Sequence, residues 1–213
     1  MLDEILAGMA KQARLLKLPV DEAAYARAGR SPRAPIACAG TPRAPICFLG
    51  RDLGRREVED GQPLVGPAGR LVRQTVLEVA GEPLRHAFLT NLVPYKPAGN
   101  RAFSARAVEG FRPLLEQLLL VYWKGRHVFA LGREATRWFS RYVDGGEAAS
   151  LWNPPRCFEH PVSCTLRGQW HGRRKFRRLL VHPLPHPSPA NALWQARLPA
   201  LLRRQLRAQG LFG

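Results

Sequence analysis

Three short polar segments each follow an apolar run, and this arrangement limits the fold more than any other feature of the chain. The apolar runs are Ile46–Leu49, Ala87–Leu89 and Leu179–Val181, and the segments after them are Gly50–Gly54, Thr90–Pro94 and His186–Pro189. Unbroken apolar runs are typical of strands buried on both faces. Segments of helical periodicity separate them, which favours a parallel sheet with right-handed crossovers. We therefore predict the α/β class, as a three-layer α/β/α sandwich around a central four-stranded, mostly parallel sheet.

Apolar periodicity and breaker residues place the remaining elements. The predicted strands are Ile46–Leu49, Ala87–Leu92, His127–Leu131 and Arg178–Leu184. The predicted helices cover about Leu2–Lys17, Glu22–Ala28, Pro67–Ala80, Ser104–Trp123, Gly132–Tyr142 and Asn191–Ala208. The stretch 143–176 is irregular, with a possible hairpin. We expect one domain over residues 1–213, in which 1–45 form an N-terminal helical and loop extension.

The chain has 213 residues and a formal net charge of +17. Such an excess favours a polyanionic partner, since neutralising phosphates releases condensed counterions. An arginine-biased composition without that role is the alternative. The densest basic cluster runs from Arg167 to Arg178 and includes Trp170 and Phe176; a solvated hairpin accounts for it almost as well as a DNA-facing surface.

No apolar run approaches the roughly 20 residues that span a membrane, so we expect no membrane partner. The acidic start, Met1–Leu6, does not have the pattern of a secretory signal, and we expect a cytoplasmic protein. The four cysteines, Cys38, Cys47, Cys157 and Cys164, lack the spacing of a disulfide framework. Cys157, His160, Cys164 and His171 could form a zinc site, but their spacing fits no established ligand pattern, so we expect no metal and no cofactor.

The carboxyl ends of parallel strands meet at one edge of a sheet, where ligands bind. Asp52 lies there between Gly50 and Gly54, which allow a sharp turn close to a ligand. Its carboxylate could orient or deprotonate water, or cap the next helix. The imidazole of His186, in a segment stiffened by prolines, could donate a hydrogen bond to an oxygen gaining negative charge; a structural proline-rich turn is the alternative.

Asn91 and Ser188 complete this edge. The Asn91 amide offers one acceptor and two donors, matching an imide edge, although asparagine at a strand end often only satisfies a turn. Ser188 could bind a phosphate through its hydroxyl or backbone amide. These side chains could act together on one small planar ligand.

A further segment, Gly61–Gly69, follows Glu59-Asp60 and reads Gly-Gln-Pro-Leu-Val-Gly-Pro-Ala-Gly. With the three strand-end segments, it makes the chain resemble the uracil-DNA glycosylase superfamily over roughly Cys47 to Leu206. The similarity extends to the family 4 enzymes, in which an acidic pair precedes a Gly-x-Pro-Phe-Val-Gly-x-Ala-Gly stretch. In this resemblance Asn91 matches the pyrimidine-recognition asparagine, and His186–Pro189 match the second catalytic motif.

Three departures from family 4 stand out. Asp52-Leu53 replace the usual Ala-Pro, and Asp52 instead falls at the register of the water-activating aspartate of family 1. Leu64 replaces the phenylalanine expected to stack on the base. Family 4 also carries an iron–sulfur cluster on four cysteines, whose spacing this chain does not reproduce, so no cluster is expected.

The resemblance implies a DNA glycosylase that hydrolyses the N-glycosidic bond of uracil, or a related deaminated base, in base excision repair. Asp52 and His186 would be catalytic. The implied substrate-binding residues are Gly50, Arg51, Gly54, Leu64, Gly66, Asn91 and Ser188, and the implied DNA-binding residues are Lys96, Arg101, Leu193 and Arg197. Three alternatives stay open: a catalytically weak or inactive damage sensor of the same fold, a glycosylase for hypoxanthine or xanthine, and a nucleotide-binding enzyme unrelated to DNA, which would not need the +17 charge.

Overall fold

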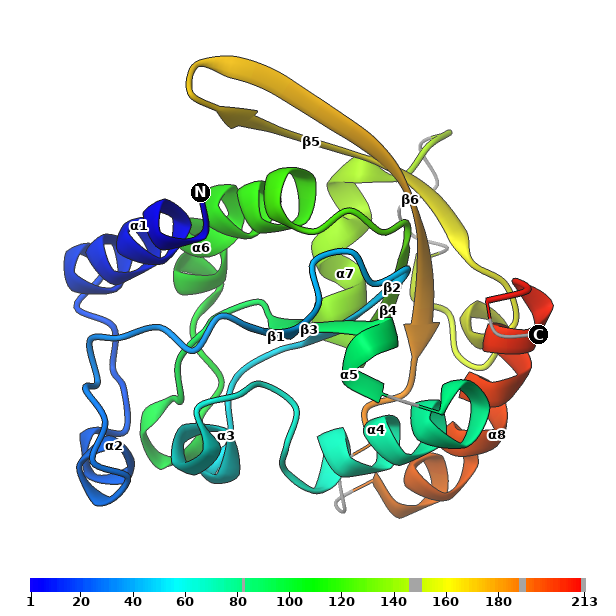
Figure 1. Cartoon of the computed structure of the whole chain (residues 1–213), viewed down its shortest axis with the longest axis horizontal. Helices are drawn as coiled ribbons and strands as arrows, with labels where there is room; N and C mark the ends of the chain where they lie inside the picture. The colour runs from blue at the N-terminus through cyan, green and yellow to red at the C-terminus, as the bar shows by residue number, and fades with distance from the viewer. Residues whose placement is uncertain (82, 146–150, 188–190, 212–213) are drawn as a thin grey trace.

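In the computed structural model, a six-stranded sheet divides the chain into two helical layers (Figure 1). The structure describes residues 1–81, 83–145, 151–187 and 191–211. The strand order is β1-β3-β2-β4-β6-β5. The strands are β1 (Cys38–Gly40), β2 (Ile46–Gly50), β3 (Ala87–Asn91), β4 (His127–Leu131), β5 (Val162–Trp170) and β6 (Arg173–Leu184).

The four central strands, β3-β2-β4-β6, are parallel to one another, which confirms the predicted α/β class. The prediction of four strands is corrected to six, because an antiparallel strand flanks each side. The short strand β1 pairs with β3 and lies in the stretch interpreted as a loop. At the other edge, β5 pairs with β6 over nine residues, where only a possible hairpin was expected.

Alternate residues of each central strand face opposite helical layers, which fixes the three-layer order. On one face, Cys47 and Leu49 of β2 lie in the same buried cluster as Ile5 and Met9 from the N-terminal helix. On the other face, Ile46 and Phe48 belong to a second buried cluster. Figure 1 shows α1 and α6 on one side of the sheet and α4 and α8 on the other.

In the described part of the chain, helices occur in each of the six predicted ranges, and four short helices lie outside those ranges. The helices are α1 (Leu2–Leu15), α2 (Glu22–Arg27), α3 (Arg55–Asp60), α4 (Pro67–Ala80), α5 (Pro83–His86), η1 (Ala98–Asn100), α6 (Ala105–Gln117), η2 (Leu118–Tyr122), α7 (Arg133–Arg137), η3 (Trp138–Tyr142), η5 (Arg156–Phe158) and α8 (Ala192–Ala208). Among the described residues, no helix has the length and hydropathy needed to cross a membrane.

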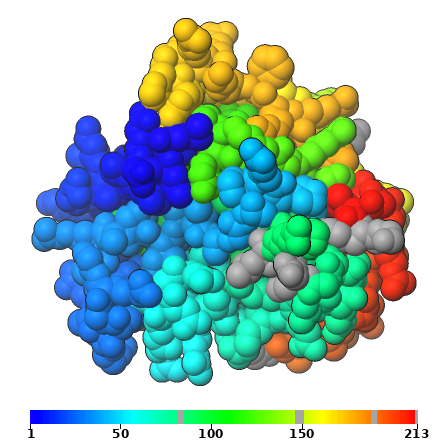
Figure 2. All heavy atoms as spheres, viewed as in Figure 1, coloured from blue at the N-terminus to red at the C-terminus, as the bar shows by residue number. Residues whose placement is uncertain are grey.

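The β5–β6 hairpin extends beyond the sheet toward the N-terminal helix. It turns at His171 and Gly172, which both have positive φ angles, 48° and 72°, as a tight two-residue hairpin turn requires. Figure 2 shows the hairpin, coloured yellow to orange, as a projection past α1 at the top of the molecule. The carboxyl end of β6 lies at the opposite end of that strand, where the candidate site begins.

Candidate functional site

The carboxyl ends of the parallel strands open into a cavity of about 700 Å³. Its walls come from the turn after β2, the loop before α4, the end of β3, and the segment after β6. The lining residues are Gly50, Arg51, Asp52, Leu53, Gly54, Glu57, Leu64, Gly66, Pro67, Ala68, Asn91, Pro97, Asn100, Leu131 and His186. The list includes Asp52, Asn91 and His186. Their positions at strand ends predicted one shared pocket, and all three line this cavity.

Asn91 lies in the floor of this cavity with its side-chain amide unused. The residue is 2% exposed, and neither its Oδ1 nor its Nδ2 atom has a hydrogen-bond partner among the described residues. Gly50 lies beside it in register, and a Cβ atom at Gly50 would be 2.2 Å from Asn91 Oδ1. Leaving a buried amide unpaired costs free energy, so the arrangement suits a ligand that supplies both a donor and an acceptor.

Asp52 lines the cavity and has one carboxylate oxygen without a hydrogen-bond partner in the described part of the chain. Its side chain is 5% exposed, and Oδ2 accepts a 2.6 Å hydrogen bond from Arg51 Nε. Oδ1 is buried and has no partner among the described residues. Burial raises the pKa of Asp52 above its usual value, while the charge and hydrogen bond of Arg51 oppose that rise. Arg51 thus favours the ionised form of a carboxylate that has one oxygen left to hold water.

His186 also lines the cavity, and the residue as a whole is exposed. Desolvation by the surrounding protein, and then the positive charge of Arg51, hold the pKa of His186 below its usual value. A neutral imidazole retains one N–H donor, so His186 can donate a hydrogen bond without carrying a charge. Ser188 lies outside the described residues.

Leu64 forms part of the wall where the resemblance led us to expect an aromatic ring. It is 7% exposed and adopts a left-handed backbone conformation, with a φ of 56°. Its carbonyl accepts a 2.7 Å hydrogen bond from Arg73 Nε. Gly69 lies directly against the Leu64 backbone, where a Cβ atom would be 2.0 Å from the carbonyl oxygen; the loop is therefore fixed by close packing as well as by hydrogen bonds.

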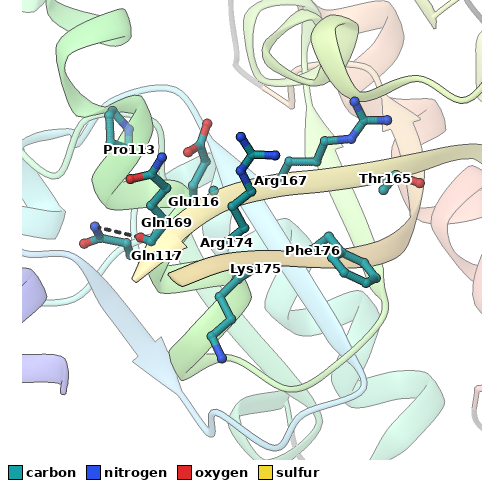
Figure 3. Close-up of a pocket in the computed structure, with 10 residues that line it drawn as sticks. Pro113, Glu116, Gln117, Thr165, Arg167, Gln169, Arg174, Lys175 and Phe176 are labelled. Carbon is teal, nitrogen blue, oxygen red and sulfur yellow. Dashed lines mark hydrogen bonds between the residues drawn. The ribbon is translucent and has the colours of Figure 1, made fainter. Parts of the chain in front are cut away.

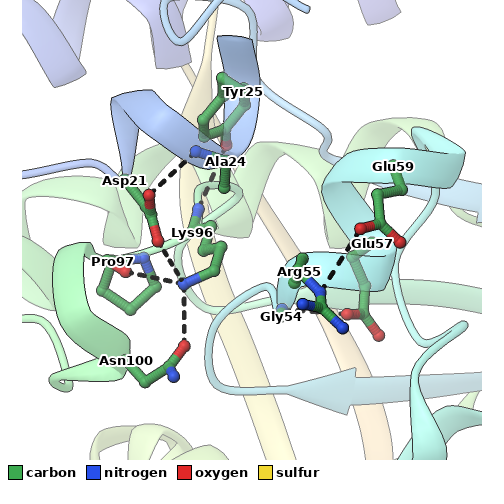
Figure 4. A network of polar contacts seen from close by, with 10 residues as sticks. All are labelled: Asp21, Ala24, Tyr25, Gly54, Arg55, Glu57, Glu59, Lys96, Pro97 and Asn100. Atoms are coloured by element: carbon green, nitrogen blue, oxygen red, sulfur yellow. Dashed lines mark hydrogen bonds and ion pairs between the residues drawn. The ribbon is translucent and has the colours of Figure 1, made fainter. Parts of the chain in front are cut away.

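Glu57 is a site residue that sequence reasoning missed. Its carboxylate accepts the backbone N–H groups of Gly54 at 3.0 Å, Val65 at 3.0 Å and Gly66 at 2.7 Å. Figure 4 shows it beside Gly54 at the start of α3. It joins the turn that carries Asp52 to the loop that carries Leu64. A glutamate three residues into a helix is one half of a capping box, and that spacing from Gly54 was the available signal.

Lys96, predicted to bind DNA, has its ammonium group bound within the protein. The residue is 3% exposed, and Nζ lies 2.9 Å from Asp21 Oδ2 and donates to Asn100 Oδ1 at 2.8 Å. Figure 4 shows this network, which links α2 to the loop after β3. The other candidates are accessible: Arg101 is exposed, Leu193 is 57% exposed, and Arg197 lies 5.7 Å from the ring centre of Trp194.

The cysteines do not form a cluster-binding set. Cys38 on β1 and Cys164 on β5 belong to opposite edge strands of the sheet, about 24 Å apart for a strand spacing of roughly 4.8 Å. Within the described part of the chain, no group of three or more histidine, cysteine, aspartate or glutamate side chains could hold a metal ion. The residues present therefore do not fit an iron–sulfur cluster of the family 4 kind.

These features define an α/β/α protein with a ligand cavity at the carboxyl edge of its parallel sheet. Residues 39–208 match the sequence profile of the uracil DNA glycosylase superfamily, so the chain belongs to this superfamily, as the resemblance predicted. It is 28% identical over 170 residues to a type-4 uracil-DNA glycosylase of Sulfurisphaera tokodaii, covering 79% of this chain and 70% of that protein.

Two other relatives have the same name. A type-4 uracil-DNA glycosylase of Saccharolobus solfataricus is 27% identical over 148 residues, covering 54% of this chain and 66% of that protein. One of Pyrobaculum aerophilum is 32% identical over 93 residues, covering 44% of this chain and 46% of that protein. The chain is thus a superfamily member similar to family 4.

Proposed function

We propose that this protein is a DNA glycosylase that removes uracil from DNA by hydrolysing the N-glycosidic bond, in base excision repair. The observation that carries the proposal is the buried amide of Asn91, which has no hydrogen-bond partner within the part of the chain that the structure describes and lines one cavity with Asp52 and His186. The imide edge of uracil presents one N–H between two carbonyl oxygens. That edge matches a carboxamide with one free acceptor and free donors.

Each side chain has a separate part in the proposed reaction. The bond breaks through a state in which positive charge grows on the sugar and negative charge on the departing base. His186 donates a hydrogen bond to the base oxygen, a contribution of about 3 kcal/mol for comparable preorganised donors. Asp52 offsets the positive charge and holds the water whose oxygen bonds to the sugar carbon, while the proton released from that water ends on the base.

The damaged nucleotide must leave the duplex to reach this cavity. Extrusion costs a few kcal/mol, and least for a mispaired base. Leu193 at the start of α8 and Arg197 one turn later are proposed to fill the vacated stack or to grip the strand, and Arg101 to contact phosphate. Ser188 is proposed as a phosphate ligand on the basis of the sequence alone. We propose that the enzyme works as a monomer in the cytoplasm, associated with the nucleoid.

The test is an excision assay on labelled oligonucleotides that carry uracil, hypoxanthine, xanthine or ethenocytosine, followed by cleavage at abasic sites. The expected result is strand cleavage at uracil in preference to the purines, since hypoxanthine lacks the second carbonyl of the imide edge and xanthine carries that edge on a larger, two-ring base. Preferred cleavage at hypoxanthine or xanthine would contradict the proposal that uracil is the substrate.

Leu64 in place of an aromatic ring favours one rival, a damage sensor without turnover, because weaker stacking lowers the stability of a flipped base. Tight binding of damaged strands with no excision of any base would establish that rival instead.

A further inference from the structure

A second cavity, of about 720 Å³, lies between the β5–β6 hairpin and α6 (Figure 3). We call it the hairpin groove. It is lined by Pro113, Glu116, Gln117, Thr165, Arg167, Gly168, Gln169, Arg174, Lys175 and Phe176. Figure 3 shows the side chains of Arg167 and Arg174 extending from the two strands on the same side as Glu116.

The hairpin that forms the groove is fixed to the body of the protein at both ends. At its base, the guanidinium of Arg177 donates to the backbone carbonyls of Trp123 at 2.6 Å and Leu120 at 2.8 Å. At its tip, His171 Nε2 lies 2.6 Å from Glu4 Oε1 of α1. The groove is therefore a preformed surface, which lowers the entropy cost of binding.

Three cations line the groove without a counter-ion among the residues that the structure describes. Arg167, Arg174 and Lys175 are exposed, and none of them forms an ion pair in the described part of the structure. Arg178 on the same strand differs, because it lies 3.6 Å from Asp144. The only carboxylate among the lining residues, Glu116, accepts a 2.5 Å hydrogen bond from the Tyr142 hydroxyl. The charge presented by the groove is thus positive and available to a polyanion.

Phe176 supplies an aromatic face on the same side of the hairpin as Arg167 and Arg174, because alternate residues of a strand share a face, whereas Lys175 extends to the other side (Figure 3). It is 78% exposed, on the β6 strand opposite Arg167. An exposed aromatic ring among unpaired basic side chains is the combination by which proteins bind single-stranded nucleic acid, since bases stack on the ring and phosphates pair with the cations. A closed duplex cannot offer an unstacked base to Phe176.

The groove is remote from the proposed catalytic cavity. Arg174 and Leu184 are at opposite ends of β6, about 30 Å apart at a rise of roughly 3.3 Å per residue. Contacts in the catalytic cavity therefore do not account for the basic cluster on the hairpin.

We propose that the hairpin groove is a second nucleic-acid site, which binds a single-stranded DNA segment through Arg167, Arg174 and Phe176, with Lys175 adding positive charge from the other side of the hairpin. This site goes beyond the proposed glycosylase function and does not depend on it. It would hold a second stretch of the DNA, or a separate strand, while the catalytic cavity holds a damaged base.

The experiment compares two triple variants that lose the same charge. The test variant carries Arg167→Gln, Arg174→Gln and Lys175→Gln. The control carries Arg27→Gln, Arg207→Gln and Lys11→Gln, which are also exposed. Binding of an undamaged 20-nucleotide thymidine strand, and of a duplex of the same length, is measured by fluorescence anisotropy from low to high salt. Circular dichroism establishes that both variants are folded.

The test variant should bind the single strand at least tenfold more weakly than the wild type, and the control less than threefold. The slope of log affinity against log salt should become shallower by about 2 in the test variant, since each lost phosphate contact removes roughly 0.7. Phe176→Ala, which keeps the charge, should lose about fivefold with an unchanged slope. Excision from a uracil pentanucleotide, too short to occupy both sites, should be unaffected.

Equal losses in the two triple variants, or no loss in the test variant, would overturn the proposal. A loss for duplex as large as that for the single strand, with Phe176→Ala unchanged, would also overturn it. Binding is measured without turnover, so a wild-type protein that excises no base would refute the proposed function and leave this test unaffected.

Discussion

The acid–base properties of the site depend on Arg51, which touches one catalytic side chain and influences the other. It donates to Asp52 at 2.6 Å, and its charge lowers the pKa of both Asp52 and His186. In the family 4 motif, Ala-Pro is usual at the positions of Asp52 and Leu53. The aspartate in this chain is buried, and the adjacent arginine favours its ionised form.

Arg51→Gln should therefore change the pH profile of excision. Without the guanidinium, burial alone acts on Asp52, and its pKa rises further. Asp52 is then protonated at a higher pH, and the acid limb of kcat/KM moves to higher pH. The pKa of His186 rises as well, which moves the limb in the same direction. The profile is measured on a uracil oligonucleotide, with Arg55→Gln, whose partner is Glu59, as the control; a limb that stays in place or moves to lower pH would refute this role.

The location of the strand-end residues in one cavity could be predicted, because the sequence directly shows both the chemical type of each residue and its position after an apolar run. Asp52, Asn91 and His186 follow apolar runs, and the parallel sheet brings them to one edge. The buried state of Lys96 was not predictable in this way, since its partner Asp21 lies 75 positions earlier in the sequence and only the folded chain brings the two together.

Among the elements, α3 holds the loop that follows it against the cavity through Glu57. The Glu57 carboxylate accepts hydrogen bonds from three backbone N–H groups, which belong to the turn before α3 and to the loop between α3 and α4. The flanking strands were predicted within a few residues, because they are continuous apolar runs. Strand β1 and the full length of β6 were not, because β1 has three residues and the outer half of β6 is an exposed basic ribbon whose pairing with β5 leaves no apolar pattern.

Glu57→Gln should weaken substrate binding more than turnover. The amide replaces one acceptor oxygen with a donor that faces a backbone N–H, so the loop carrying Leu64 loses part of its support. Hydrogen bonds to a charged group contribute about 1.5–3 kcal/mol, and we expect KM for a uracil oligonucleotide to rise about tenfold with a smaller change in kcat. Glu59→Gln, on the exposed side of α3, is the control. A positioning role would be contradicted if Glu57→Gln had the kinetic constants of the wild type. It would also be contradicted if the loss of activity equalled the fraction of the variant that is unfolded.

At the scale of the whole molecule, the N-terminal segment and the sheet share one core. Ile5 and Met9 of α1 are buried in the same cluster as Phe88 of β3 and Val128 of β4. We therefore expect residues 1–45 to unfold together with the rest of the chain. Differential scanning calorimetry should show one transition whose calorimetric and van't Hoff enthalpies agree; two separated transitions would contradict a single domain.

The distribution of the cysteines leads to a prediction about the purified protein. They are spread over β1, β2, η5 and β5, and burial raises the pKa of the thiols of Cys38 to about 11 and of Cys164 to about 12. We expect a colourless protein without stoichiometric iron or acid-labile sulfide, by elemental analysis and visible absorbance. A broad visible band that is lost together with sulfide on acidification would refute this prediction.

The central claim is that one cavity at the sheet edge breaks the N-glycosidic bond with Asp52 and His186 while Asn91 holds the base. The most direct measurement is the single-turnover rate of uracil release by the wild type and by Asp52→Asn, alongside the affinity of each for the same uracil-containing strand. Asp52→Asn keeps the shape of the side chain and removes its charge. The rate should fall about a hundredfold or more, the order of loss typical of a preorganised electrostatic group, with affinity within about threefold of wild type. Release of uracil by Asp52→Asn at the same rate as by the wild type would contradict the account.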